Sequence, residues 1–343
     1  MTRPREGIDV EKRMAVIGAG SWGTALSQVF AANDYTVSLW TREKDLCDDI
    51  NIRHINTHFM PGVTLSGNIH ASTDIEQTVT GQEIVLVVVP SQYMRDVVRQ
   101  AAPFIEKNAR IVSAVKGIET STLMRPTEII RDIAGTHVTC AVLSGPSFAK
   151  EVIAGMPTAI TIASDNIDTA RQLQHALNTR TLRLYAADDM TGVELGGSLK
   201  NVISIAAGIC DGANIGKSAR AAIITRGLAE TIRLGMKLGA KRETFSGLSG
   251  LGDLVLTATD EQSRNRTVGF RIGKGERIQD IVSGMIMVAE GVQTSLSVHR
   301  ISGKLDLDMP VSSEIYQILH QNKDARESIK TLLNRTLKDE HYG

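Results

Sequence analysis

The sequence has no net charge and few cysteines. Its 343 residues contain 38 lysines and arginines against 38 aspartates and glutamates. Such a balance provides no overall field to attract nucleic acid or an acidic membrane, so any anion site must be local. The three cysteines, Cys47, Cys140 and Cys210, are odd in number and far apart. This pattern argues against a disulfide framework and a zinc cluster, and it fits a reducing cytoplasm.

Targeting and membrane-spanning segments are also lacking. Residues 1–13 are polar and charged, without the apolar stretch of a signal peptide. The longest purely apolar run, IVLVVV, ends at Pro90 and is far too short to cross a bilayer. We therefore expect a soluble cytoplasmic protein with no membrane insertion, no nucleic-acid partner and a short polar arm before Met14. A chain of this length can bury a sizeable core in one large domain or two ordinary ones.

The first half of the sequence alternates between strand-like and helix-like patterns. Helical stretches such as 24–33 and 94–103 separate short β-branched runs. Runs that are apolar at successive positions are typical of strands buried on both faces of a parallel sheet. The alternation predicts a doubly wound parallel α/β sheet. The expected strands are MAVI, TVSLW, IVLVVV, RIVSAV and VTCAVL, with TAITIA and LRLYAA as weaker candidates.

The pattern changes near residue 190. From Thr191 onward the sequence shows helical periods, such as the apolar stripe of 194–210, and no convincing strand alternation. We therefore predict two domains, a doubly wound α/β domain over 12–190 and an all-helical domain over 191–340.

Three glycines follow the first expected strand and open a helical pattern. In VIGAGSWGTALS, Gly18 allows a tight turn, Gly20 leaves room for a pyrophosphate, and Gly23 lets the helix lie close to the strand. The helix N-terminus then presents free N–H groups to the phosphates. In this context the turn predicts dinucleotide binding, although such a turn can also be purely structural. Trp22 is either a packing residue of the loop or a lid over the cofactor.

The end of the second expected strand carries Arg42 and Glu43. An acidic residue at this place would bind the ribose 2′-hydroxyl and favour NAD. A guanidinium can instead fork onto a 2′-phosphate or lie against adenine, which favours NADP or the use of both cofactors. The alternative is a solvated Arg42 with Glu43 contacting the ribose.

Two polar residues stand beside the apolar stripe of the second half. Lys200 and Asn201 lie in GGSLKNVIS. A lysine next to a buried face loses hydration, which lowers its pKa toward neutrality and suits it to general acid–base catalysis. For this helix alone, the commoner reading is a lysine whose stem packs on apolar surface while its ammonium reaches water.

Further polar residues gather in three short segments. SGLSGLGDLVLT contains one carboxylate expected to be buried, Asp253. SRNR, residues 263–266, places cations at an expected helix start, which is a ready phosphate site or simply a solvated turn. SGPSF offers Ser147 and backbone N–H groups at a strand end. His54 and His58 lack an evident third ligand, so no metal site is predicted.

Taken in order, a series of longer motifs resembles the bacterial-type NAD(P)-dependent glycerol-3-phosphate dehydrogenases. The motifs cover the chain from about Met14 to about Lys338. They are VIGAGSWGTALS, VVVPS, VKGIE, SGPSFAKE, GGSLKNVISIAAGICDG, TRGLAE, GLSGLGDLVLT, SRNR and VAEG.

The resemblance implies a Rossmann domain and a helical domain with the site between them, and a homodimer. It implies interconversion of sn-glycerol 3-phosphate and dihydroxyacetone phosphate with NAD(P)(H), without a metal, which supplies the backbone for phospholipid synthesis. Lys200 would carry the proton, and Lys116 would contact substrate and cofactor. Polar residues around the reacting centre would be Asn201, Asp253 and Thr257.

The resemblance also implies the remaining contacts. Besides the lysines and Asp253, the substrate contacts would be Gly145, Ser147, Ser263, Arg264 and Asn265. Besides the three glycines and Lys116, the dinucleotide contacts would be Ser21, Trp22, Arg42, Ala149, Arg264, Val288 and Glu290.

Two rival functions remain open at this point. One is a dehydrogenase of the same architecture that acts on a β-hydroxyacid or a phosphorylated sugar acid. The other is a regulator that binds NAD(P)H without turnover. Lys200, Asp253 and the SRNR segment argue against the regulator, because a sensor needs no proton carrier.

Overall fold

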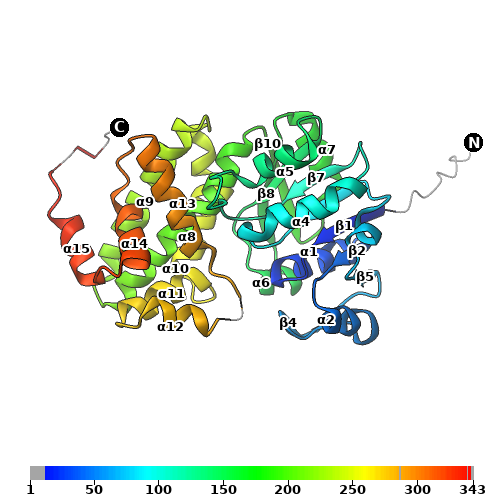
Figure 1. Cartoon of the computed structure of the whole chain (residues 1–343), viewed down its shortest axis with the longest axis horizontal. Helices are drawn as coiled ribbons and strands as arrows, with labels where there is room; N and C mark the ends of the chain where they lie inside the picture. Colours follow the sequence, from blue (N-terminus) through cyan, green and yellow to red (C-terminus); the bar gives the residue numbers. More distant parts are fainter. Residues whose placement is uncertain (1–11, 286, 338, 341–343) are drawn as a thin grey trace, which may run out of the picture.

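The N-terminal half forms one eight-stranded sheet. The structure, a computed structural model, describes residues 12–285, 287–337 and 339–340 (Figure 1), so the arm before Lys12 lies outside the described residues. The strand order is β10-β9-β8-β7-β6-β1-β2-β5. The strands are β1 (Lys12–Ile17), β2 (Tyr35–Trp40), β5 (Ile69–Ser72), β6 (Ile84–Val87), β7 (Arg110–Ser113), β8 (Thr139–Ser144), β9 (Thr158–Ala163) and β10 (Leu182–Ala187).

The predicted parallel sheet is confirmed from β5 to β8, and all the expected strands are present. The pair β8–β9 is antiparallel, while β9 and β10 are again parallel. The reversal has a local cause. The short helix α6 (Ala149–Ile153) packs on α1 (Ser21–Ala31) instead of returning along the sheet. The chain therefore enters β9 from the edge at which β8 ended. The sequence did not predict β5 or the small hairpin of β3 (Ile55–Asn56) and β4 (Met60–Thr64).

Strand β1 explains why its residues are apolar at successive positions. Met14 and Val16 face a core cluster that contains α1, and Ala15 and Ile17 face a second cluster that contains α4 (Met94–Ala101). All four residues are completely buried, because side chains alternate between the two covered faces of the sheet. The other helices of this half are α2 (Lys44–Asp48), α3 (Ile75–Val79), α5 (Pro126–Ala134) and α7 (Ile167–Leu177).

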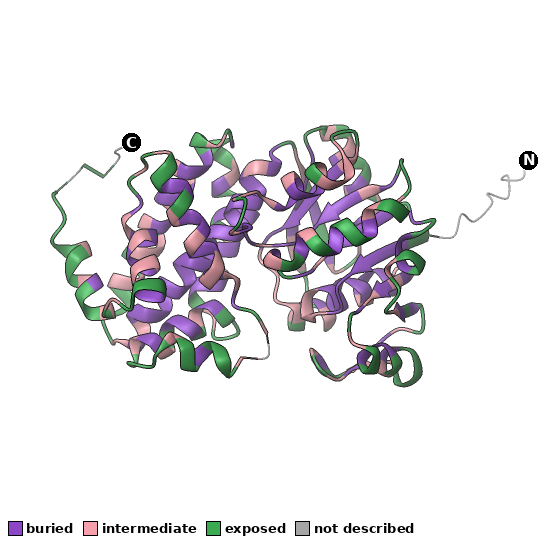
Figure 2. Ribbon diagram, in the orientation of Figure 1, coloured by how far each residue is buried: buried purple, intermediate pink, exposed green. Residues whose placement is uncertain are grey.

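Helices alone make up the described chain after β10, as the sequence predicted. The central one is α8 (Met190–Gly212), which is buried along almost all of its 23 residues (Figure 2). It is long and apolar enough to cross a membrane, but in this fold it is covered on all sides by protein. Around it lie α9 (Lys217–Lys237), α10 (Asp253–Thr259), α11 (Arg264–Gly273), α12 (Ile278–Ser283), α13 (Glu290–Lys304), α14 (Pro310–Gln321) and α15 (Ala325–Leu333).

Helices α8 and α11 approach each other closely because α8 lacks side chains at the contact. A Cβ added to Gly208 would lie 2.1 Å from the carbonyl oxygen of Arg266. Any larger residue must push α11 away from α8. This contact places Arg266, in the first turn of α11, beside the C-terminal part of α8.

We expect Gly208→Ala to destabilise the protein by about 1–3 kcal/mol, because overpacking moves a backbone segment. Gly303→Ala, in α13, is the matched control, since a Cβ there meets nothing within 4 Å. It should be neutral or stabilise by up to about 1 kcal/mol, the difference in helix propensity. Urea unfolding of both variants measures this. Equal stability of the two would show that α8 and α11 are not packed so closely.

Candidate active site

A buried cluster of two lysines and one aspartate lies between the sheet and the helical half. The Nζ atom of Lys200 donates to Oδ1 of Asp253 and, at 2.8 Å, to Oγ1 of Thr257. The Nζ atom of Lys116 lies 2.7 Å from Oδ2 of the same aspartate. One carboxylate therefore serves two ammonium groups, and only 1% of Asp253 is exposed.

Three different segments deliver these groups. Lys116 follows β7 at the carboxyl edge of the sheet, the edge at which open α/β sheets bind ligands. Lys200 lies in the middle of α8. Asp253 opens α10, and Thr257 follows one turn later on the same helix face, so both point toward Lys200. The expected burial of Asp253 is confirmed.

The surroundings change the proton affinity of Lys200. Burial disfavours its ammonium form and lowers the pKa to about 7, and the charge of Lys116 acts in the same direction, while Asp253 opposes both. A lysine with a pKa near neutrality can both accept and donate a proton under physiological conditions. The alternative of a lysine whose ammonium reaches water is wrong, because Lys200 is only 8% exposed.

A chain of amide hydrogen bonds links this cluster to α11 and α13. Asn201 Nδ2 donates to the carbonyl oxygen of Lys116 at 3.1 Å, and its Oδ1 accepts from Nδ2 of Asn265 at 2.9 Å. Asn265 Oδ1 in turn accepts from the N–H of Gly291 at 2.9 Å. Asn201 and Asn265 thus fix the helices around the lysines.

The SGPSF segment also reaches the cluster. Lys116 Nζ donates to the carbonyl oxygen of Gly145 at 2.9 Å, and Ser147 Oγ donates to the same oxygen at 3.0 Å. Ala149 begins α6 and packs against the core beneath the sheet. Gly145 and Ser147 therefore lie beside the ammonium group of Lys116.

The SRNR segment forms the expected helix start. The Ser263 hydroxyl accepts from the N–H of Arg266 and caps α11. The Arg266 guanidinium is paired with Asp211, which also binds Arg220. The Arg264 side chain is exposed, and its Nη1 donates to the carbonyl oxygen of Val288 at 3.2 Å. Of the two arginines, Arg264 is the one that an incoming phosphate can reach.

The glycine turn fits a pyrophosphate. Gly18 has φ +118°, and an added Cβ would lie 2.7 Å from a backbone oxygen. Gly20 is the N-cap of α1 without a side-chain hydrogen bond, and a Cβ there meets nothing within 4 Å. There is therefore open space beside Gly20, and the first N–H groups of α1 have no capping side chain. Gly23 packs closely, since its Cβ would lie 1.9 Å from the oxygen of Gly18.

A hairpin that the sequence did not predict covers this turn. Asn56, at the end of β3, is completely buried and donates to the carbonyl oxygen of Ala19 at 2.8 Å. The Ser21 hydroxyl donates to the carbonyl oxygen of Phe59 at 3.0 Å and lies 3.1 Å from the sulfur of Met287. The hairpin and the loop before α13 therefore meet over the first turn of α1. Only a local signal, an asparagine before a Phe-Met-Pro-Gly turn, could have pointed to it.

Trp22 lies in the first turn of α1, and Arg42 follows β2. Trp22 packs on the core, and its buried Nε1 has no hydrogen-bond partner among the described residues. Arg42 is 80% exposed and pairs with Glu43 at 2.9 Å. This exposed position allows both a contact of Arg42 to a 2′-phosphate and a solvated charge.

Glu290 connects the two halves. Its carboxylate accepts from the N–H of Ser91 at 2.9 Å and from the Ser91 hydroxyl at 2.5 Å. Burial raises the pKa of Glu290. Val288, two residues earlier, is exposed. Ser91 was not singled out in the sequence, although its place in the loop that follows the central parallel strand β6 is a recognisable signal.

The histidines stand apart from this site. His58 Nε2 lies 3.3 Å from Asp45. Among the described residues, no group of three or more histidines, cysteines or acidic residues could hold a metal ion.

Two features define an NAD(P)-dependent oxidoreductase of the Rossmann class. One is a turn suited to phosphate after the first strand of a parallel sheet, and the other is a buried lysine with a pKa near neutrality beside the carboxyl edge of that sheet. The model of the NAD-dependent glycerol-3-phosphate dehydrogenase N-terminus matches residues 13–170, and that of the C-terminus matches residues 189–330. The chain therefore belongs to the NAD-dependent glycerol-3-phosphate dehydrogenase family.

Curated relatives agree with this family over nearly the whole chain. The glycerol-3-phosphate dehydrogenase (NAD(P)+) of Syntrophobacter fumaroxidans is 45% identical over 95% of this chain and 97% of its own. That of Myxococcus xanthus is 46% identical over 96% and 99%.

The solved structures of this family share the fold. Glycerol-3-phosphate dehydrogenase from Coxiella burnetii superposes with a TM-score of 0.91 at 39% identity, covering 95% of this chain and 99% of that one. A ketopantoate reductase from Ralstonia eutropha, at 13% identity and a TM-score of 0.61 over 92% of this chain and 99% of that one, shares the fold alone.

Gly20→Ala should leave the fold nearly intact and weaken cofactor binding about tenfold or more, because its Cβ enters the open space before α1. The cost to stability should stay below about 1 kcal/mol, the difference between the two residues as helix caps. The control is Gly67→Ala, another position with nothing within 4 Å. Fluorescence titration with NADH and NADPH measures both variants, and unchanged affinity in Gly20→Ala would place the pyrophosphate elsewhere.

Proposed function

We propose that the protein interconverts sn-glycerol 3-phosphate and dihydroxyacetone phosphate with NAD(P)(H). The observation that carries this proposal is the buried Lys200, with its pKa lowered to about 7, beside Asp253 and Lys116 at the carboxyl edge of the sheet. Family membership supports the substrate pair. The arginine-bearing start of α11 supports a phosphorylated substrate.

The lysines do the proton chemistry in this proposal. When bound, the nicotinamide cofactor supplies or accepts the hydride. In the reducing direction, Lys200 carries a proton at Nζ and donates it to the carbonyl oxygen of the substrate as negative charge grows there. Asp253 and Thr257 orient Nζ, to which both are hydrogen-bonded. Lys116 adds positive charge, and its repulsion makes Lys200 a readier proton donor.

The phosphate group positions the substrate. Arg264 would bind it, together with the N-terminal N–H groups of α11 and the polar groups of Ser263 and Asn265. Gly145 and Ser147 would contact the rest of the molecule. A substrate fixed at its phosphate presents its carbonyl to Lys200 in one orientation, which lowers the entropic part of the barrier.

The glycine turn would hold the dinucleotide. Its pyrophosphate would face Gly20 and the free N–H groups of α1. The other contacts that we assign to it come from Gly18, Ser21, Trp22, Gly23, Arg42, Lys116, Ala149, Arg264, Val288 and Glu290. The open space at Gly20 supports this placement.

The wider setting is also part of the proposal. We assign residues 12–190 to the dinucleotide-binding domain and 191–340 to the substrate-binding domain. We further propose a cytoplasmic homodimer that supplies glycerol 3-phosphate for glycerophospholipid synthesis. Family membership supports the assembly and the role.

Lys200→Arg separates charge from proton transfer. Arginine can still pair with Asp253, but its pKa is too high to release a proton. We expect kcat to fall by about 10²-fold or more, with NADH binding retained.

In the unmodified enzyme, kcat for ketone reduction should fall as the pH rises through the pKa of Lys200, because the proton donor is lost, whereas kcat for alcohol oxidation should rise. Stopped-flow and steady-state rates from pH 5.5 to 9.5 test both; full turnover of a folded Lys200→Arg protein would exclude this role.

Arg264→Lys should raise KM for dihydroxyacetone phosphate although it keeps the charge, because an ammonium cannot make two parallel bonds to phosphate. Arg264→Ala should lose on the order of 2–4 kcal/mol in kcat/KM. Unphosphorylated dihydroxyacetone should be affected much less. Arg271→Ala, at the far end of α11, is the control, because Arg271 pairs with Glu276. An equal loss for both substrates in Arg264→Ala would mean that this arginine serves the cofactor or the fold.

A further inference from the structure

The segment that carries Lys116 has no regular structure of its own. Between β7 and α5, residues 114–125 form neither helix nor strand. Such a segment must satisfy its backbone N–H and C=O groups through other parts of the protein. The position of the Lys116 ammonium therefore depends on the side chains that form hydrogen bonds with this loop.

One side chain from the sheet half, that of Gln92, forms hydrogen bonds with two residues of the loop. Gln92 Nε2 donates to the carbonyl oxygen of Ile118 at 3.0 Å. Gln92 Oε1 accepts from the N–H of Thr120 at 3.0 Å and from the Thr120 hydroxyl at 2.8 Å. Its remaining amide hydrogen reaches Ser91 Oγ at 3.0 Å. The whole hydrogen-bonding capacity of the Gln92 amide is thus used, and most of it is used on the loop.

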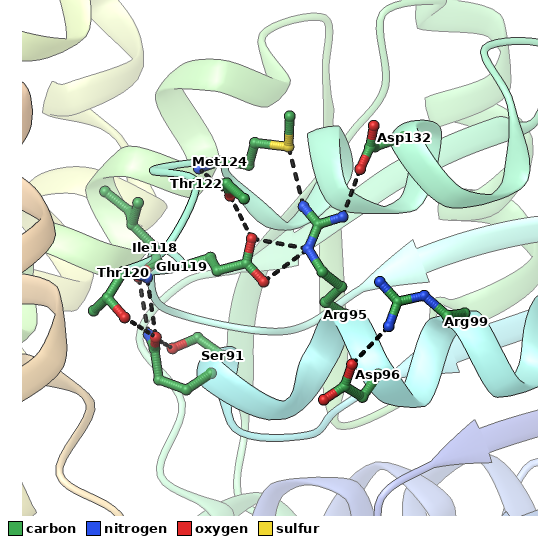
Figure 3. Close-up of polar contacts among 11 residues, drawn as sticks. Ser91, Arg95, Asp96, Arg99, Ile118, Glu119, Thr120, Thr122, Met124 and Asp132 are labelled. Carbon is green, nitrogen blue, oxygen red and sulfur yellow. Dashed lines mark hydrogen bonds and ion pairs between the residues drawn. The ribbon is translucent and has the colours of Figure 1, made fainter.

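Glu119, between these two residues of the loop, is fixed from helix α4, which begins just after Gln92. Arg95, in the first turn of α4, places Nε 3.0 Å from each carboxylate oxygen of Glu119 and Nη1 2.5 Å from Asp132 (Figure 3). Glu119 is 4% exposed and also accepts from Thr122. Figure 3 shows that the second ion pair of α4, Arg99 with Asp96, points away from the loop.

Side chains of the helical half also form hydrogen bonds with this loop. Ser297 Oγ, on α13, donates to the carbonyl oxygen of Ile118 at 3.0 Å. Arg300 Nη1, one turn later, donates to the carbonyl oxygen of Thr120 at 2.9 Å. With Asn201 on the carbonyl oxygen of Lys116, alternate carbonyl groups of the loop are bound one after another. The loop of residues 116–120 is therefore held from both halves.

We propose that Gln92 is a positioning residue, which fixes the loop of residues 116–120 and so keeps the Lys116 ammonium on Asp253 and beside Lys200. It touches neither the reacting atoms nor the lysine side chains, and it acts through the backbone of Ile118 and Thr120. This inference rests on the proposed function, because it assigns Gln92 to the reaction through the role of Lys116.

The rate measurement uses Gln92→Met, which keeps the length of the side chain and removes its hydrogen bonds. The control is Gln100→Met on the neighbouring helix α4, because Gln100 is exposed and its one side-chain hydrogen bond among the described residues goes to the carbonyl oxygen of Asp96. We expect kcat for dihydroxyacetone phosphate reduction to fall about tenfold in Gln92→Met, with KM changed less than twofold. Gln100→Met should match the unmodified enzyme.

The pH profile gives a readout that a merely structural role would not move. Among the described residues, Asp253 and Lys116 are the charged groups that face Lys200. When Lys116 moves away, the repulsion that lowers the pKa of Lys200 weakens. The fall of kcat at high pH should therefore move to higher pH in Gln92→Met. In a Lys116→Met background, Gln92→Met should cause no further shift, because the two substitutions act on one interaction.

A measurement on the cofactor-free protein separates this inference from the proposed function. Mass spectrometry follows acylation of lysines by an amine-reactive ester. Lys116 is 16% exposed and ion-paired, and it should react several-fold faster in Gln92→Met, whereas Lys241, 47% exposed, should not change. An unchanged acylation rate of Lys116 would overturn the positioning role. Faster acylation with unchanged kcat and pH profile would instead show that Lys116 has no role in the reaction, and the proposed function would have to be revised there.

Discussion

The carboxylate of Asp253 is the interaction on which the site depends. It lies almost without solvent between two ammonium groups, one from a loop of the sheet half and one from the central helix of the other half. Removing it would leave two like charges buried together, which is far more costly than losing an exposed ion pair. The two halves of the chain are therefore joined at the same point at which we propose that the chemistry takes place.

Other buried acidic residues serve the architecture rather than the reaction. Glu194, on α8, accepts from the N–H of Thr127 at 2.7 Å and pairs with Arg125, which ties α8 to the start of α5. Glu230, on α9, accepts from the N–H groups of Val311 and Ser312 at the start of α14. Each carboxylate thus accepts hydrogen bonds from N–H groups in the first turn of a different helix, which have no partner within that helix. The frame that carries Lys200 is thus fixed by polar contacts as well as by apolar packing.

Local chemistry explains what the sequence could predict. The strands and the glycine turn were predictable because their signals lie within a few adjacent residues. The partnership of Lys116 with Asp253 was not derivable from spacing, because the residues are 137 positions apart; only the family resemblance brought them together. Asn56 and Gln92 were missed because a two-residue strand and an irregular loop leave no periodic pattern. The antiparallel direction of β9 was not predicted. Helix α6 is so short that its sequence does not indicate which element it packs against.

Helix α1 begins at Gly20 without a capping side chain, and glycine at this position costs only about a few tenths of a kcal/mol relative to Ser, Thr, Asn or Asp. The chain gives up this small stabilisation, and in the function that we propose a side chain there would occupy the place of an anion. An anion bound at that turn would restore it, since a ligand that binds only the native state stabilises that state. Local unfolding of this turn exposes the chain to proteases. Its frequency would then depend on the concentration of cofactor in the cell. The same turn would so connect how long the protein survives with how fast it can work.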